Sequence, residues 1–229
     1  MLRLKEFLND PPTFLRRHHL IFKGLGPEVQ GGATHDFLLI ESHLHPARRR
    51  TAALGLSLHK ATAGLFEVRA RRGANLAPQA LERGEVFQAA WGGYKAGTKI
   101  SCALVANGPD LMLTPELTGC TIAFATQSNG TASFSHYNLM DPQLPGQTLP
   151  VSNMVAEAHA DFGYAGNVGV LSKEVYRGKI KHRGGAGRAT VIGWRKNGEW
   201  TFWAQYIEVK GAVYQIRGVE QLRPGIRFG

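Results

Sequence analysis

Alternating apolar and polar residues dominate the second half of the chain, and this pattern predicts a β-sheet. Residues 99–106 (KISCALVA) form the first expected strand, which Asn107-Gly108-Pro109 ends. Residues 114–139 follow as a hairpin that turns at Ser128-Asn129-Gly130. A three-stranded meander is expected near the C-terminal end, with a tight turn at Lys196-Asn197-Gly198 and strands at 189–194, 199–209 and 212–217.

The first half of the chain mixes helical and strand-like spacing of its apolar residues. Residues 2–8 (LRLKEFL) predict a short amphipathic helix that Asp10-Pro11-Pro12 stops, inside a loose basic segment at about 1–34. Further helices are expected at 48–60 and 77–91, and strands at 35–44 and 64–70. Together these elements predict a single α/β domain over residues 1–229, with its helices mainly in the first half.

Composition narrows the class of protein without naming a function. The formal net charge is +10 and the 28 glycines are spread along the chain, which suits a basic, turn-rich globular domain. The charge favours acidic partners, but nucleic acid is not expected, because no recognisable nucleic-acid module surrounds the basic runs. No apolar stretch has the length of a membrane span or the form of a Sec signal peptide, so neither is expected.

The two cysteines, Cys102 and Cys120, offer no disulfide framework, so both are expected to be free thiols. Cys102 lies in the middle of an expected strand and is interpreted as a small buried apolar residue. Cys120 lies at the mouth of the hairpin, and His136 lies on its return strand. A catalytic cysteine needs such a base, which removes the thiol proton or stabilises the thiolate.

The length of the hairpin turn decides whether Cys120 and His136 share a face of the sheet. With a two-residue loop at Asn129-Gly130, the alternation of side chains puts them on opposite faces. With a three-residue loop at Ser128-Asn129-Gly130, they are diagonal neighbours on one face, about 7–8 Å apart at the backbone. The sequence leaves both turns open.

The residues before the cysteine suit nucleophilic attack on a carbonyl group. Glycine at position 119 allows a substrate to approach the sulfur closely, and the backbone amides around Thr118, Gly119 and Thr121 are expected to receive an oxyanion. Thr114, in an irregular segment before a proline, is expected to place a carbonyl or hydroxyl beside His136. The result is a Thr-x5-Cys-x15-His arrangement.

Leu117-Thr118-Gly119-Cys120 resembles the Leu-Ser-Gly-Cys motif of cysteine-dependent glutamine deamidases, with threonine in place of the serine. This group includes the catalytic domain of cytotoxic necrotizing factor toxins, Burkholderia lethal factor 1 and, more distantly, the chemoreceptor deamidase CheD. The resemblance covers about residues 100–140. It implies Cys120 as nucleophile, His136 as base and Thr114 as the residue that orients the histidine. It also implies a sandwich of mixed β-sheets with flanking helices and long loops, and no cofactor or metal.

The resemblance further implies a reaction and a biological role. The sulfur of Cys120 would attack the side-chain carboxamide of a protein glutamine, and water would hydrolyse the thioester to glutamate, with transglutamination as a side activity. The implied protein is a bacterial toxin or effector, made in the bacterial cytoplasm and secreted or injected into a host or competitor cell without a Sec signal peptide. Its expected partner is a target protein with an acidic surface, and the enzyme is expected to be a monomer.

Other interpretations compete for the same residues. Cys120 also fits a buried structural cysteine, in a basic module that binds RNA or protein. His43-Leu44-His45, with Asp36 and Glu41 nearby, would place two imidazoles on one strand face, but no second cluster completes a metal site. The glycine-rich segment 184–188 lacks the Lys-Ser/Thr of a P-loop and is expected to be a turn.

Overall fold

A computed structural model describes the chain at residues 2–22, 31–41, 64–70, 85–144, 146–162, 168–179, 186–210, 213–224 and 227–228. Its helices are α1 (Leu2–Asn9), α2 (Pro11–Arg17), α5 (Val151–Phe162) and α6 (Lys173–Gly178). Its strands are β1 (His18–Phe22), β2 (Thr34–Glu41), β3 (Gly64–Ala70), β4 (Glu85–Trp91), β5 (Thr98–Leu104), β6 (Leu111–Leu113), β7 (Thr121–Thr126), β8 (Ala132–Asn138), β9 (Val168–Leu171), β10 (Ala186–Lys196), β11 (Glu199–Lys210), β12 (Val213–Leu222) and β13 (Arg227–Phe228).

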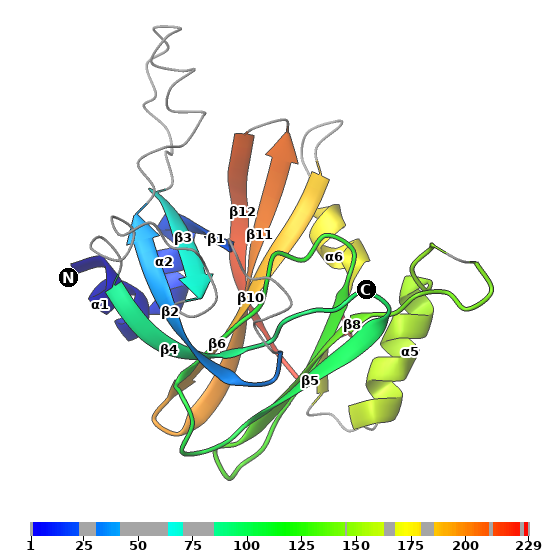
Figure 1. Cartoon of the computed structure of the whole chain (residues 1–229), viewed down its shortest axis with the longest axis horizontal. Coiled ribbons are helices and arrows are strands. Elements are labelled where there is room, and N and C mark those ends of the chain that lie inside the picture. The colour runs from blue at the N-terminus through cyan, green and yellow to red at the C-terminus, as the bar shows by residue number, and fades with distance from the viewer. Residues whose placement is uncertain are drawn as a thin grey trace, which may run out of the picture.

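The strands form two mixed sheets (Figure 1). The larger one, sheet A, has the order β1-β3-β2-β4-β6-β10-β11-β12, and the smaller one, sheet B, has the order β13-β9-β7-β8-β5. Parallel pairs join β1 to β3 and β4 to β6 in sheet A, whereas the meander from β10 to β12 is antiparallel. The described chain is therefore mostly strand, with a few short helices.

The short strand β6 lies at the centre of sheet A and is covered on both faces. Leu111 and Leu113 join a core with side chains of α1, α2 and β1–β4, whereas Met112 points into a core shared with sheet B. All three residues of β6 are buried, as is typical of a strand with two covered faces. The strand thereby fixes the start of the segment that leads to Cys120.

Sheet B lies between this shared core and helix α5 (Figure 1). Ile122, Phe124 and Phe134 of β7 and β8 face sheet A, and they pack near Phe202 of β11. The alternate residues of the same strands face α5, where the hydroxyl of Tyr137 donates a hydrogen bond to the carboxylate of Asp161 at 2.7 Å. Every second residue of β7 and β8 thus faces the shared core, and Cys120 and His136 lie on that side of sheet B.

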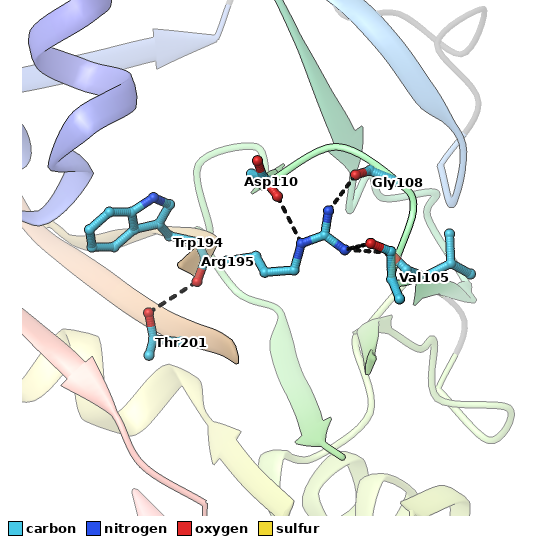
Figure 2. Close-up of polar contacts among 7 residues, drawn as sticks. Val105, Gly108, Asp110, Trp194, Arg195 and Thr201 are labelled. Carbon is cyan, nitrogen blue, oxygen red and sulfur yellow. Dashed lines mark hydrogen bonds and ion pairs between the residues drawn. The ribbon is translucent and has the colours of Figure 1, made fainter. Parts of the chain in front are cut away.

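Arg195, near the end of β10, holds the loop that connects β5 to β6 (Figure 2). Its Nε donates to the Asp110 carboxylate at 2.8 Å, and its two Nη atoms donate to the carbonyl oxygens of Val105 at 2.9 Å and Gly108 at 2.6 Å. One Nη also donates to the carbonyl of Ala106. A single planar guanidinium thus satisfies several loop carbonyls and sets where β6 begins.

The N-terminal segment is more ordered than the sequence indicates. Asp10 ends α1 and also caps α2, because its carboxylate accepts a hydrogen bond from the backbone nitrogen of Thr13 at 3.1 Å. Pro11 and Pro12 occupy the first two positions of α2, where a missing N–H costs nothing. Helix α2 and strand β1 therefore occupy residues 11–22 of the segment expected to be loose.

Most predicted strands are present, and one predicted helix is wrong. Strand β3 has the predicted bounds, and the turn after Lys196 closes on Asn197-Gly198 with positive φ angles of 53° and 81°. Residues 85–91, expected to be helical, form β4 because they pair with β2 on one side and β6 on the other. The helix expected at 48–60 lies outside the described residues, and α5 and α6 were not anticipated.

Candidate active site

The hairpin of β7 and β8 has the three-residue turn Ser128-Asn129-Gly130. The backbone nitrogen of Gln127 donates to the carbonyl of Thr131 at 3.0 Å, and Gly130 has a φ of 77°, which glycine adopts without strain. The register pairs Ile122 with His136. This is the alternative that places Cys120, one residue before β7, diagonally across from His136 on the same face of sheet B.

The imidazole of His136 is fully buried, with 1% of the residue exposed. Its Nδ1 lies 3.2 Å from the carbonyl oxygen of Gly92, and its Nε2 has no hydrogen-bond partner among the described residues. A carbonyl only accepts, so the neutral ring carries its hydrogen on Nδ1 and keeps a lone pair on Nε2. Burial lowers the pKa of His136 to about 4, although the backbone of Gly92 and Gly93 acts in the opposite direction.

Two glycines bring the backbone of sheet A against this ring. A Cβ atom at Gly92 would lie 2.7 Å from the ring of Phe134, and one at Gly93 would lie 2.5 Å from the indole nitrogen of Trp91. Gly92 also donates its backbone N–H to the carbonyl of Leu113 at 2.8 Å, which anchors the peptide at the end of β4. Glycine at both positions therefore leaves room for the buried rings of Phe134 and Trp91 beside this segment.

The thiol of Cys120, directly before the first residue of β7, is buried, with 8% of the residue exposed. Burial raises its pKa to about 11, while a hydrogen bond from the backbone of Gly119 and the charge of Lys173 act to lower it. At neutral pH the resting pair is thus an uncharged thiol and an uncharged imidazole. The buried hydroxyl of Tyr176, on α6, donates to the carbonyl oxygen of Cys120 at 3.1 Å.

Thr114 makes different contacts from those expected of it. Its hydroxyl accepts the backbone N–H of Val191 at 2.9 Å and donates to the carbonyl of the same residue at 3.2 Å. These bonds join the segment after β6 to β10 in sheet A. The contact expected between Thr114 and His136 is made by Gly92 instead, whose carbonyl oxygen, just after β4, lies within hydrogen-bond distance of Nδ1.

The three residues expected to support an oxyanion lie in different surroundings. Thr118 is exposed, and Gly119 is half-buried with open space where a Cβ would stand. Thr121 is fully buried on the opposite face of β7 from Cys120, and its hydroxyl has no hydrogen-bond partner among the described residues. Thr118 and Gly119 therefore border the thiol from the solvent side, whereas the side chain of Thr121 points away from it.

Tyr94 lies outside the buried ring of His136. The two ring centroids are 5.9 Å apart, and Tyr94 is 58% exposed. It follows the glycine pair on the segment between β4 and β5. Of the site's contacts, those of Tyr94, Gly92 and Tyr176 were missed by sequence reasoning, although paired glycines at the end of a strand are a signal of close backbone approach.

The part of the chain that the structure describes holds no cluster of metal-ligating side chains. There, no three His, Cys, Asp or Glu side chains lie together as ligands of one metal ion would. The residues of the His43-Leu44-His45 stretch lie outside the described ranges. No described helix is both long enough and apolar enough to cross a lipid bilayer.

Comparisons with known proteins give a weak structural likeness. No protein-family model and no curated protein matches the chain. Among solved structures, the chain is similar to the C-terminal domain of CNFy from Yersinia pseudotuberculosis, at 10% sequence identity and a TM-score of 0.41, over 96% of each chain. A TM-score this low assigns neither fold nor activity to the chain.

Proposed function

We propose that the protein is a cysteine-dependent hydrolase that converts a glutamine side chain of a target protein to glutamate. The observation that carries the proposal is the placement of Cys120 and His136 on one face of sheet B, with the imidazole held by Gly92 and its Nε2 lone pair without a partner. A buried base with an unused lone pair on the same sheet face as a thiol is the arrangement that nucleophilic cysteine chemistry starts from. The motif at residues 117–120 supports the choice of a glutamine amide.

The first half of the reaction forms a thioester. Because both groups are neutral at rest, Nε2 of His136 takes the thiol proton as the sulfur of Cys120 attacks the carboxamide carbon. The carbonyl π bond opens to an oxyanion, for which the backbone amides at Gly119 and Cys120 are the proposed donors. When the oxyanion collapses, the C–N bond breaks, and the imidazolium gives its proton to the leaving amide nitrogen, which departs as ammonia.

The second half of the reaction restores the enzyme. His136 takes a proton from water, whose oxygen attacks the thioester carbon, and the C–S bond breaks as the second tetrahedral species collapses. The proton on the imidazole returns to the sulfur of Cys120. Glutamine and water thus become glutamate and ammonia, and an amine in place of water would give transglutamination.

The proposed biological setting is that of a toxin or effector that disables a protein of another cell. The motif resemblance supports this setting, and the net charge of +10 favours a target with an acidic surface. A new carboxylate on the target adds one negative charge, which is sufficient to change a binding or catalytic surface.

The direct test exposes whole-cell protein extracts to the wild type and to Cys120→Ser, His136→Asn and Cys102→Ser. Mass spectrometry then locates glutamines converted to glutamate. Cys102→Ser is the matched control, because Cys102 is also a buried thiol facing the shared core. We expect conversion with the wild type and Cys102→Ser, and none with the other two. Conversion that survives Cys120→Ser, or no conversion by any protein, contradicts the proposal.

Hydroxylamine makes the same test specific for the intermediate. A thioester of Cys120 is attacked by hydroxylamine faster than by water, so the glutamine becomes a hydroxamate in its presence. We expect the hydroxamate with the wild type and with Cys102→Ser, and with neither of the other two variants. Glutamate without hydroxamate would contradict a thioester.

A second candidate function is a basic binding module in which Cys120 is structural. The low exposure of the Cys120 thiol and of the His136 ring favours it, because buried cysteines are commonly small apolar residues. It is distinguished by the same variants: a binding module keeps its function in Cys120→Ser, whereas the enzyme loses it.

A further inference from the structure

The short helix α6 brings a buried tyrosine to the nucleophile. Tyr176 is fully buried in the shared core, and its hydroxyl donates to the carbonyl oxygen of Cys120 at 3.1 Å. Burial raises the pKa of Tyr176 above its ordinary value, so the hydroxyl keeps the proton that it donates. The bond holds the peptide group that follows the nucleophile and ties α6 to the mouth of the hairpin.

The register of sheet B brings Lys173, the first residue of α6, to the level of Cys120. In the β7–β9 ladder, Ile122 pairs with Leu171. Two residues before Ile122 is Cys120, and two residues after Leu171 is Lys173, so the antiparallel register brings these two to the same level. Ser172, between Leu171 and Lys173, keeps an extended backbone with φ −97° and ψ 167°. Consistent with this placement, the charge of Lys173 lowers the pKa of the Cys120 thiol against the effect of burial.

His136 and Lys173 therefore flank Cys120 from the two strands beside β7. His136 comes from β8 and is neutral at rest, whereas Lys173 follows β9 as the first residue of α6 and carries an ammonium group. An anion on a buried sulfur is costly unless a cation or a hydrogen-bond donor is close. The imidazole becomes a cation only after it takes the proton, so a fixed cation would act earlier in the reaction.

We propose that Lys173 stabilises the negative charge that develops at Cys120 and that Tyr176 is the positioning residue that keeps α6 against the nucleophile. This inference rests on the proposed function, because it assigns two further residues to the same site. It predicts that the reactivity of Cys120 depends on α6 in the absence of any glutamine. The thiol itself can therefore report on it.

The test measures the alkylation rate of Cys120 by iodoacetamide at a series of pH values from about 7 to 10, with mass spectrometry to separate it from Cys102. Iodoacetamide is uncharged, so a lysine does not attract it. We expect Lys173→Gln to slow alkylation about threefold at each pH below the thiol pKa, which corresponds to an apparent pKa raised by about half a unit. Lys173→Arg keeps the charge and should keep the wild-type profile.

Arg177→Gln is the matched control, because it removes one positive charge from the exposed side of the same helix. Its profile should equal that of the wild type, and the slow alkylation of Cys102 should be the same in every variant. Equal rates for Lys173→Gln and the wild type overturn the role of Lys173. Equal slowing by Lys173→Gln and Arg177→Gln also overturns it, because the effect would then be one of net charge.

Tyr176→Phe tests the positioning role while keeping the aromatic ring in the core. If the hydroxyl holds α6 in place, Tyr176→Phe should remove the rate increase that Lys173 gives to the alkylation of Cys120. Adding Lys173→Gln to this variant should then slow alkylation no further. A full additional threefold loss in the double variant overturns the positioning role. None of these alkylation rates involves a glutamine. The roles of Lys173 and Tyr176 can therefore be contradicted independently of the glutamine conversion that tests the proposed function.

Discussion

Nδ1 of His136 lies 3.2 Å from the carbonyl oxygen of Gly92, and this contact joins the two sheets at the candidate site. His136 belongs to β8 of sheet B, and Gly92 follows β4 of sheet A. The carbonyl fixes the tautomer of the ring, and the backbone N–H of Gly92 donates to the carbonyl of Leu113 in β6. The orientation of the imidazole is therefore set by sheet packing and does not depend on a dedicated side chain.

The buried neutral ring of His136 should make stability depend on pH. Its pKa is about 4 in the folded protein and near 6.5 in an unfolded chain, so between these values the unfolded chain takes up a proton that the folded one does not. The free energy of unfolding should thus fall as pH drops from about 6.5 to about 4, by at most ~3 kcal/mol. Urea denaturation at several pH values measures it.

The matching variant for this prediction is His136→Gln, which removes the titrating group. Its free energy of unfolding should vary less with pH over the same interval than that of the wild type. A wild type and a His136→Gln variant with the same slope would show that the ring is not the group that titrates.

Replacing Gly92 should disturb the fold and the base together. In Gly92→Ala the new Cβ would stand 2.7 Å from a ring carbon of Phe134 and 3.2 Å from the sulfur of Met112, so the backbone must move. We expect a loss of about 1–3 kcal/mol in the free energy of unfolding. A shift of the Nδ1 resonance of His136 in NMR spectra should accompany it. Gly218→Ala, where no atom lies within 4 Å of the added Cβ, should be close to the wild type.

Thr114 should matter for stability and little for the thiol. Thr114→Val keeps the shape of the side chain but removes the acceptor of the buried N–H of Val191, which should cost about 1–3 kcal/mol in the free energy of unfolding. Thr114→Ser keeps the hydroxyl and should recover much of this loss. Because its hydroxyl binds Val191 and not His136, the alkylation profile of Cys120 should stay as in the wild type; a changed profile would restore the orienting role expected from the sequence.

The local pattern of apolar and turn residues was sufficient to predict the hairpin and its two possible turns. A turn of Ser128-Asn129-Gly130 is readable from the sequence because glycine supplies the positive φ that a three-residue loop needs. The choice between two registers was not readable, because both are compatible with the local residues. It is settled by the shared core, which requires Phe124 and Phe134 on the same face.

Long-range contacts explain what sequence reasoning missed. Gly92 lies 44 residues from His136 and Tyr176 lies 56 residues from Cys120, so neither contact leaves a local spacing to recognise. The same reason underlies the error at residues 85–91, which form a strand because they pair with β2 and β6. Thr114 was assigned to the histidine from its irregular segment before a proline and from the motif resemblance, yet its hydroxyl bonds to the backbone of Val191 in β10.

Arg195 should be the main determinant of order in the loop between β5 and β6. Arg195→Met keeps an unbranched side chain beside Trp200 but removes the donors that Val105, Gly108 and Asp110 share. We expect a loss of about 2 kcal/mol in the free energy of unfolding, and faster hydrogen exchange of the loop amides, including that of Gly108. Denaturant titration and exchange mass spectrometry measure these effects.

Lys196→Met is the control for this prediction, because Lys196 is the next residue, is exposed and holds its ammonium over Trp194 at 5.1 Å. It removes the same charge from the same strand end without touching the loop. Its free energy of unfolding should lie within about 0.5 kcal/mol of the wild type, and its loop amides should exchange as slowly. Equal losses in the two variants would mean that the charge at the end of β10 matters and the guanidinium bonds do not. A loss confined to Arg195→Met, with loop exchange accelerated ahead of the amides of β6, would mean that these bonds order the entry to the segment that carries the candidate nucleophile.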